Sequence, residues 1–406
     1  MKSEVKALIF TSVGHFANDG TFLLFSALIV FYSNIGIPVY FTGSLAIVYT
    51  LLSGIFALYV GKLSDKFNKD PELMSIGILI MGISVALLAL PFYSSYGEYY
   101  TVTLGSLILG IGQAFYHPIG ANIIRFSKPG RDMSDFLGIN GSFGSLGRSL
   151  LILVFGAFVL STGDFTGTLL YAIIFIVLSG IIYSGTYRIR KPERKSGKQN
   201  KSMKGELTGS AGVWGFIAVL TSSFFLRSMF LGSVSVYIFS YLDQIDGNSS
   251  ALSFIFLGVS LMTPVIGQPF FGYLTRKKGG FLTVVLTGVI SFVMFVGFLA
   301  TNMYYIDLIF YSVYAFAAYT GFPTLLGFIG QNVPASVSAR ANTIAWGLGN
   351  TIGSSAGLAF FLLFYKVLDQ SLHTVFIEIS LFLLASIIIA LFIPVYSRKI
   401  VHETET

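Results

Sequence analysis

The chain alternates between long apolar runs and short polar breaks, and twelve of the runs are long enough to cross a lipid bilayer. A helix needs roughly 20 apolar residues to do so. The breaks contain Gly, Pro and charged residues, as in "DKFNKDPE" and "DQIDGNSS", which are typical of loops. The pattern predicts an all-α membrane protein with twelve transmembrane helices, at residues 5–33, 40–60, 73–92, 101–125, 135–160, 167–187, 213–241, 251–273, 281–300, 305–330, 340–365 and 373–396.

The composition supports a membrane location and excludes several kinds of chemistry. Only 11% of the residues are charged, and the mean hydropathy is +0.79, whereas about a quarter of the residues in soluble domains are charged. The chain has no Cys, and its four His are scattered, which argues against disulfides and metal sites. No phosphate-binding Gly-rich turn stands out. We therefore expect a monomer in the lipid bilayer of the cell membrane, without cofactor, metal, nucleotide or nucleic-acid partner.

Positive charges are distributed unevenly between the breaks. If the N-terminus is cytoplasmic, every Lys and Arg except Arg148, Arg227 and Lys366 falls in a terminus or in a cytoplasmic loop. Such an excess is typical of the cytoplasmic side of membrane proteins. Both termini are therefore predicted to be cytoplasmic, and the net charge of +7 needs no other explanation.

The two halves of the chain repeat each other. Three residues recur 205 positions later, since Pro118, Pro129 and Gly144 return as Pro323, Pro334 and Gly349. "GKLSDKFNK" at 61–69 is echoed by "GYLTRKKGG" at 272–280. Two related six-helix halves around a central site are a transporter architecture. We expect two pseudo-symmetric six-helix bundles, at 1–187 and 211–406, joined by a basic cytoplasmic linker at 188–210.

Several motifs extend this expectation to a family. Twelve runs, a long basic central loop and the spacing Gly61-x-x-x-Asp65-Lys66-x-x-Lys69 resemble the major facilitator superfamily (MFS). "GHFANDG" at 14–20 and "GIGQAFYHPIGANIIRFSKPGR" at 110–131 are similar to the fosmidomycin-resistance drug exporters. The resemblance implies the MFS fold, alternating access and a gating role for Gly61, Asp65, Lys66 and Lys69 as a cytoplasmic latch.

Polar residues follow one face of the first predicted helix. Thr11, His15, Asn18, Asp19 and Phe22 recur at helical spacing. Asp19 lies about 21 Å along the helix, near the centre of the bilayer, where a charged group is costly and usually faces a cavity. We interpret Asp19 and His15 as the proton-coupling residues and Asn18 as a substrate-binding residue. The alternative is a permanent structural ion pair.

Two arginines also lie within predicted helices, Arg148 in the fifth and Arg227 in the seventh. We expect both to face the central cavity and to bind substrate. The repeat places Arg227 next to the counterpart of Asp19, and the resemblance implies that the two could meet when the outer side is closed. Separate structural ion pairs are the alternative. Glu378 in the twelfth helix has no role that the sequence defines.

The fourth predicted helix carries Gln113, Tyr116 and His117. Gln113 and His117 share a face, and Pro118 removes a backbone donor and can bend the helix. We assign the three side chains to substrate binding, with a histidine satisfied by a neighbouring carbonyl as the alternative.

The sequence thus favours a proton-coupled secondary active transporter that exports a small, drug-like organic molecule. The two arginines would allow this molecule to carry an anionic group. An importer or antiporter of organic anions, such as sugar acids or phosphorylated sugars, is the second hypothesis. A passive channel or a membrane scaffold is the third. A hydrolytic enzyme is disfavoured, because no arrangement of Ser, His and Asp stands out.

Overall fold

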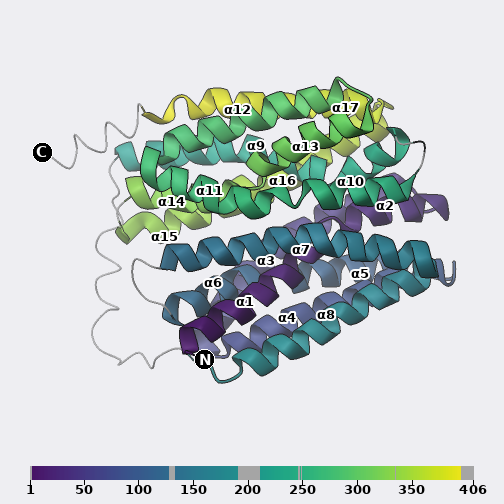
Figure 1. Cartoon of the computed structure of the whole chain (residues 1–406), viewed down its shortest axis with the longest axis horizontal. Coiled ribbons are helices and arrows are strands. Elements are labelled where there is room, and N and C mark those ends of the chain that lie inside the picture. Colours follow the sequence, from purple (N-terminus) through teal and green to yellow (C-terminus); the bar gives the residue numbers. More distant parts are fainter. Residues whose placement is uncertain are drawn as a thin grey trace, which may run out of the picture.

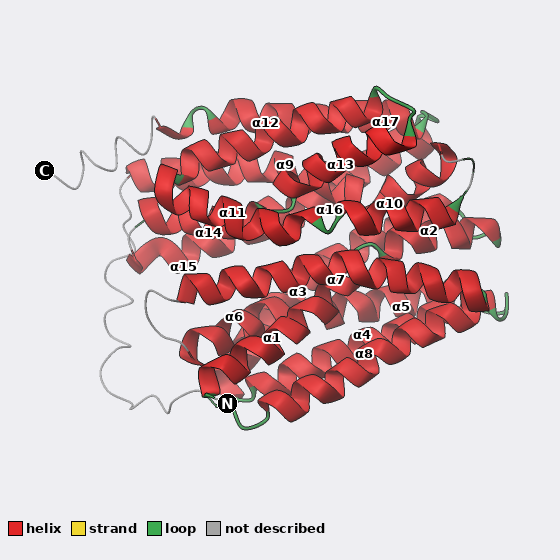
Figure 2. Ribbon diagram, in the orientation of Figure 1, coloured by secondary structure: helices red, strands yellow, loops and turns green. Residues whose placement is uncertain are grey.

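The structure is a computed structural model that describes residues 2–127, 133–190, 211–245, 247, 249–333 and 335–394. Within these residues every regular element is helical (Figure 2). The basic linker predicted at 188–210 lies almost wholly outside the described residues. Eleven helical segments are long and apolar enough to cross a membrane, which confirms an all-α membrane protein. The predicted tenth helix is divided into two shorter helices, and the count of twelve remains a prediction.

The first half of the chain forms one group of helices, drawn below the second half in Figure 1. The start of α1 and the described end of α17 lie at the left in that view, which we call the terminal end; the opposite end is the far end. The helices of the first half are α1 (Ser3–Gly20), α2 (Leu24–Asn34), α3 (Val39–Phe67), α4 (Asp70–Ala89), α5 (Glu98–Gln113), α6 (Tyr116–Ser127), α7 (Met133–Thr162) and α8 (Asp164–Thr186), with a 3-10 turn η1 (Leu90–Phe92).

The second half forms the other group and contains two π-helical segments. Its elements are α9 (Ala211–Ile245), α10 (Ser250–Ser260), α11 (Thr263–Lys278), α12 (Gly280–Leu299), α13 (Tyr304–Ala318), α14 (Gly321–Asn332), α15 (Ala335–Ile344), the π-helix η3 (Ala345–Ile352), α16 (Gly353–Leu362), the π-helix η4 (Leu363–Val367) and α17 (Leu372–Ala390).

Four of the apolar runs are broken near their middle, into α1 and α2, α5 and α6, α10 and α11, and α13 and α14. In three of them a proline lies in the first turn after the break: Pro118 in α6, Pro264 in α11 and Pro323 in α14. Proline is tolerated there because the first turn of a helix has no intrahelical acceptor for its N–H. Polar residues lie beside two of these breaks, Asp19 before one, and Gln113 and His117 on either side of the other.

Glycines allow equivalent pairs of helices to pack closely in the two halves. A Cβ at Gly147 of α7 would collide with the carbonyl of Phe16 on α1, and one at Gly357 of α16 would collide with the carbonyl of Met229 on α9. Small residues permit this kind of close approach in membranes. The contact of α7 with α1 fixes the position of the fifth predicted helix beside the first, and so the position of Arg148.

The two halves are joined at the far end and along α7. The backbone N–H of Phe239 on α9 donates to Ser26 on α2 (3.2 Å), and the rings of Phe31 and Phe239 are 6.2 Å apart. Nearer the centre, Ser149 donates to the carbonyl of Gly258 (2.6 Å), and Gln268 donates to Ser145 (2.7 Å). The structure is therefore closed at its far end.

We predict that Gly147→Ala lowers stability, because the added methyl group collides with the Phe16 carbonyl. The expected loss is about 1–3 kcal/mol, typical of overpacking, measured as a lower midpoint of thermal unfolding in detergent. Gly138→Ala is the matched control on the same helix, since a Cβ there meets nothing within 4 Å. Equal midpoints for the two variants would show that α1 and α7 are not in close contact.

Candidate functional site

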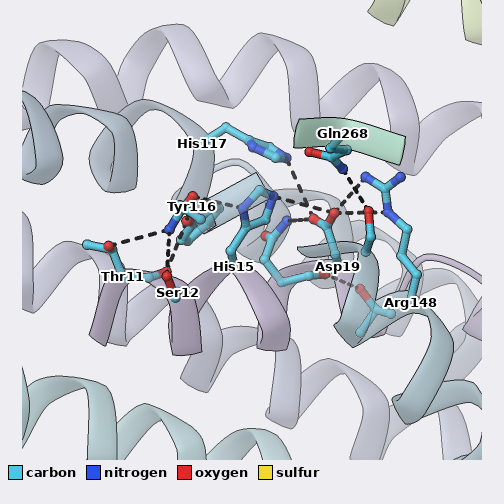
Figure 3. A network of polar contacts seen from close by, with 12 residues as sticks. Thr11, Ser12, His15, Asp19, Tyr116, His117, Arg148 and Gln268 are labelled. Atoms are coloured by element: carbon cyan, nitrogen blue, oxygen red, sulfur yellow. Dashed lines mark hydrogen bonds and ion pairs between the residues drawn. The ribbon is translucent and has the colours of Figure 1, made fainter. Parts of the chain in front are cut away.

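An ion pair lies at the centre of the first half. Asp19 is the next-to-last residue of α1 and only 4% exposed. The carbonyl end of a helix carries a partial negative charge, so a carboxylate at this point requires a cation. Arg148 of α7 supplies it, donating from Nε (2.9 Å) and from a terminal nitrogen (2.6 Å) to Asp19 Oδ2 (Figure 3). The Phe22 ring packs on the guanidinium at 4.6 Å, and that of Tyr319 from the second half lies at 5.7 Å.

Two histidines and an asparagine complete the surroundings of this carboxylate. His15 Nε2 is 3.5 Å from Oδ2, and His117 Nε2 is 4.0 Å from Oδ1. Asn18 donates to Oδ1 (3.0 Å). His15 and Asp19 are one helical turn apart, as the sequence pattern predicted, and His117 comes from α6, just after its break. The arrangement can hold an ionised carboxylate and can exchange protons with two imidazoles.

Asn140 of α7 is a site residue that the sequence did not single out. It is 5% exposed, and its Oδ1 lies 2.9 Å from His15 Nδ1 and 2.9 Å from the hydroxyl of Tyr116. The Tyr116 ring also stacks on His15, with centroids 4.7 Å apart. Asn140 lies two turns before Arg148 on the same helix, and this spacing is the signal from which the sequence could have found it.

Gln113 has a structural contact in this state. Its side-chain amide donates to Thr21 Oγ1 (2.9 Å), in the break between α1 and α2. This bond ties the two broken runs together at the depth of Asp19. The structure thus brings together one set of predicted residues, all in the first half: His15, Asn18, Asp19, Gln113, Tyr116, His117 and Arg148.

Arg227 is not part of that cluster, contrary to the expectation that it faces the cavity and meets Asp19 when the outer side is closed. It is 6% exposed, and its guanidinium donates to Thr287 Oγ1 (3.0 Å) and to the carbonyls of Ala317 (3.3 Å) and Ala318 (3.2 Å). These carbonyls end α13, where the helix dipole is negative. The second half therefore compensates this charge internally, while Asp19 pairs with Arg148.

The predicted latch residues lie at the terminal end of α3. Gly61 and Ser64 line a cavity of about 210 Å³, and the Lys66 ammonium lies 5.0 Å from the centre of the Phe67 ring. Lys69 immediately precedes α4, and the side chain of Asp65 is outside the described set. Asn68 has a left-handed backbone (φ 50°), a conformation that Asn tolerates better than most residues other than Gly.

The lining of the same cavity includes the residue that follows His117. Pro118, Ala121, Asn122 and Arg125 of α6 line it together with α3. One residue before Pro118, the His117 side chain is 40% exposed although it contacts the buried Asp19. The Trp346 ring of η3 faces His117 from the second half, with centroids 6.4 Å apart. His117 is therefore the member of the cluster that solvent and ligands reach first.

Glu378 lies near the far end, away from the cluster. Gln370 donates to its Oε1 (3.1 Å), so this carboxylate has a local partner in the loop before α17.

Comparisons with known proteins agree with this architecture. The sequence matches the Major Facilitator Superfamily over residues 8–358. The fold is similar to two crystal structures of a bacterial homolog of the human lysosomal transporter Spinster, one inward-facing and occupied, the other inward-facing and unoccupied. Each is 12% identical with a TM-score of 0.67, over 98% of this chain and 96% of the other. At this identity the likeness shows the fold alone. No curated protein matches the sequence.

We predict that Arg148→Gln costs about 3–5 kcal/mol of stability, because it leaves the Asp19 carboxylate buried without its counter-ion. The double variant Asp19→Asn with Arg148→Gln should lose less, since neither charge then stays buried alone. Unfolding midpoints of the two single variants and the double variant in detergent measure the coupling. Losses that simply add would show that the two side chains do not stabilise each other.

Proposed function

Because the chain belongs to the major facilitator superfamily, we propose that it is a secondary active transporter driven by protons and working by alternating access. As a member of this family it is a membrane transporter and not an enzyme. The proposal is carried by one observation: a buried ion pair, Asp19 with Arg148, contacts two imidazoles, and one of them, His117, is 40% exposed. A plain structural ion pair would not require the imidazoles.

Proton coupling follows from the chemistry of this cluster. Histidine is the side chain whose charge changes most readily near neutral pH, and both histidines lie within 4.0 Å of the Asp19 carboxylate. A proton gained or lost here changes the charge of a site that is screened from water. Such a change alters the affinity of the same site for a charged or polar ligand. This is the requirement for coupling the movement of protons to the movement of substrate.

Aromatic rings from the second half support a drug-like substrate. Trp346 faces His117, and Phe224 of α9 packs beside Trp346 with centroids 6.3 Å apart. Gly321 and Gly349 make room for the Phe224 ring, since a Cβ at either would lie 3.3 or 3.0 Å from it. Flat, polarisable walls of this kind suit organic ring systems. Export, as in the drug exporters that the sequence motifs resemble, is the direction we propose.

A second candidate, an importer or antiporter of organic anions, is favoured by Arg148. Its guanidinium is 18% exposed and directs two N–H groups at Asp19. An anionic substrate that displaced Asp19 would receive the same bidentate interaction, which suits carboxylate, phosphate or phosphonate. Arg227 does not take part in this version, because its terminal nitrogens donate to Thr287 and to the carbonyl end of α13 within the second half.

The closed far end supports alternating access over a passive channel or a scaffold. If the terminal end is cytoplasmic, as the charges predict, the closed far end faces away from the cytoplasm. The latch proposed around Gly61, Asp65, Lys66 and Lys69 would then hold the opposite state, in which the terminal end is closed.

We predict that Asp19→Asn abolishes substrate flux driven by a pH gradient while the protein stays folded, because Asn gives neither Arg148 nor the two imidazoles the negative charge that they contact. Flux into and out of proteoliposomes, with the gradient imposed in each direction, measures coupling and direction together. Asp369→Asn is the matched control, an exposed residue whose positive φ of 52° Asn also tolerates. Full coupled flux in Asp19→Asn would refute proton coupling through this site.

We predict that Asp65→Asn shifts the population toward the state that is open at the terminal end, because it removes a charge from the latch. The chain has no Cys, so spin labels attach only at introduced cysteines. Labels at Ser127, the last residue of α6, and Lys278, the last residue of α11, report the separation of the two halves. A distance distribution that does not change from the unmutated chain would remove the latch from the mechanism.

A further inference from the structure

The hydrogen bonds around His15 indicate which atom exchanges the proton. Both ring nitrogens have partners: Nε2 lies 3.5 Å from Asp19 Oδ2, and Nδ1 lies 2.9 Å from Asn140 Oδ1 (Figure 3). The ring is stacked on Tyr116 and is only 12% exposed. Its orientation is therefore fixed, and each nitrogen can be assigned separately.

The Asp19 side of the ring favours a permanent proton on Nε2. Two N–H groups of Arg148 and one of Asn18 already stabilise the ionised form of this carboxylate. A bare Nε2 would direct its lone pair at a carboxylate oxygen, which is repulsive, whereas Nε2–H is attracted to it. Asp19 thus stays ionised, and the nitrogen facing it stays protonated.

Nδ1 has a different kind of partner, because a side-chain amide can present either an acceptor or a donor. With Asn140 oriented as in the structure, Oδ1 accepts from Nδ1–H of a doubly protonated His15, and Nδ2 lies 3.4 Å from Thr11 Oγ1. The Thr11 hydroxyl donates its own hydrogen to the carbonyl of Ala7 (2.7 Å). Its oxygen can therefore accept a hydrogen bond from Nδ2 of Asn140.

A half-turn of the Asn140 amide gives neutral His15 a donor for its bare Nδ1. Nδ2 then donates to the bare Nδ1, and the Tyr116 hydroxyl donates to the carbonyl of Thr11, 3.0 Å away. Oδ1 turns toward the hydroxyl of Ser12, which lies 3.5 Å from the present amide nitrogen and can donate to it. Oxygen and nitrogen of an amide differ little in shape, so the half-turn needs no repacking.

We propose that Nδ1 of His15 is the atom that gains and loses the proton, and that Asn140 is a positioning residue whose amide turns over to match each state. Asp19 and Arg148 remain an ion pair throughout. The inference rests on the proposed proton coupling and specifies its chemistry: the proton leaves Nδ1 as H⁺ and the lone pair stays on the nitrogen.

The charged and titratable groups that face His15 come from three helices. Asp19 lies on α1 itself and favours the imidazolium. Arg148 of α7 and, when protonated, His117 of α6 (ring centroids 5.5 Å apart) oppose it, and Tyr116 is the remaining titratable neighbour. The contacts of α1 with α4 and α8 are apolar at these points: Met74 of α4 packs against Gly14, and Phe10 packs against Gly185 of α8. His117 lies next to His15, and because its side chain is 40% exposed it gives protons a route to His15 from solvent.

Histidine labelled with ¹⁵N in the purified full chain tests this directly, since there are only four His to resolve. The resonance lost in His15→Gln identifies the residue. We expect it to change with pH between a doubly protonated ring and a neutral ring that keeps its proton on Nε2. At the pH where both forms are present, Asn140→Asp, which can only accept, should raise the ratio of doubly protonated to neutral ring by about tenfold.

Asn140→Leu should lower the same ratio, because it offers Nδ1–H no acceptor. Asn34→Asp, an exposed change at the end of α2, controls for the added charge. The proposal is overturned if the neutral ring carries its proton on Nδ1, or if the Asn140 variants leave the ratio unchanged. It is equally overturned if infrared spectra show a protonated carboxyl that disappears in Asp19→Asn. The NMR and infrared spectra need no substrate. If they place the proton at Nδ1 but proteoliposomes show no gradient-driven flux, the proposed function is refuted and the assignment of the proton to Nδ1 is not.

Discussion

The ion pair between Asp19 and Arg148 constrains the whole centre of the protein. In a medium of low dielectric constant neither charge is tolerated alone, so α1 and α7 must stay in register at this depth. Close packing of Gly147 on Phe16 provides the matching steric constraint one turn away. The histidines, Asn18 and Asn140 are then arranged around a fixed centre. Their positions follow from the pair rather than from contacts with the second half.

Each half compensates its own buried charge. Asp19 and Arg148 belong to the first half, while in the second half Arg227 is held by Thr287 and the carbonyl end of α13. Across the interface near the centre, the described contacts include aromatic rings, Tyr319 against Arg148 and Trp346 against His117, and neutral hydrogen bonds of α7. Parting these contacts therefore breaks no described ion pair.

Much of the site was readable from the sequence because charge in an apolar run is a strong signal. His15, Asp19, His117 and Arg148 stand out in this way, and all four converge. Asn140 did not stand out, since a neutral amide in a run with many serines and glycines has little cost of its own. Arg227 shows the other limit. The repeat places it beside the counterpart of Asp19, but which neighbour it faces depends on how α12 and α13 pack around α9, and no local pattern carries that information.

The helix boundaries have a similar explanation. Pro118 indicated one of the four breaks in the sequence. The break after Gly20 has no proline, so the hydropathy pattern predicted one continuous helix there. The tenth run illustrates the result, since α13 and α14 together cover the predicted helix but α13 alone has 15 residues. Local turns that depend on tertiary contacts are not visible in hydropathy.

The four breaks also determine where this molecule is pliable. A helix bends most easily where its ladder of backbone hydrogen bonds is interrupted, and each break separates a segment that runs to the far end from one that runs to the terminal end (Figure 1). The short segments α1, α6, α11 and α14 can tilt about these joints relative to α2, α5, α10 and α13. Because Asp19 and His117 lie within two residues of such joints, a small tilt of α1 or α6 moves the His117 imidazole relative to the Asp19 carboxylate. The points where these helices can bend and the residues of the candidate site therefore lie at the same place in the fold.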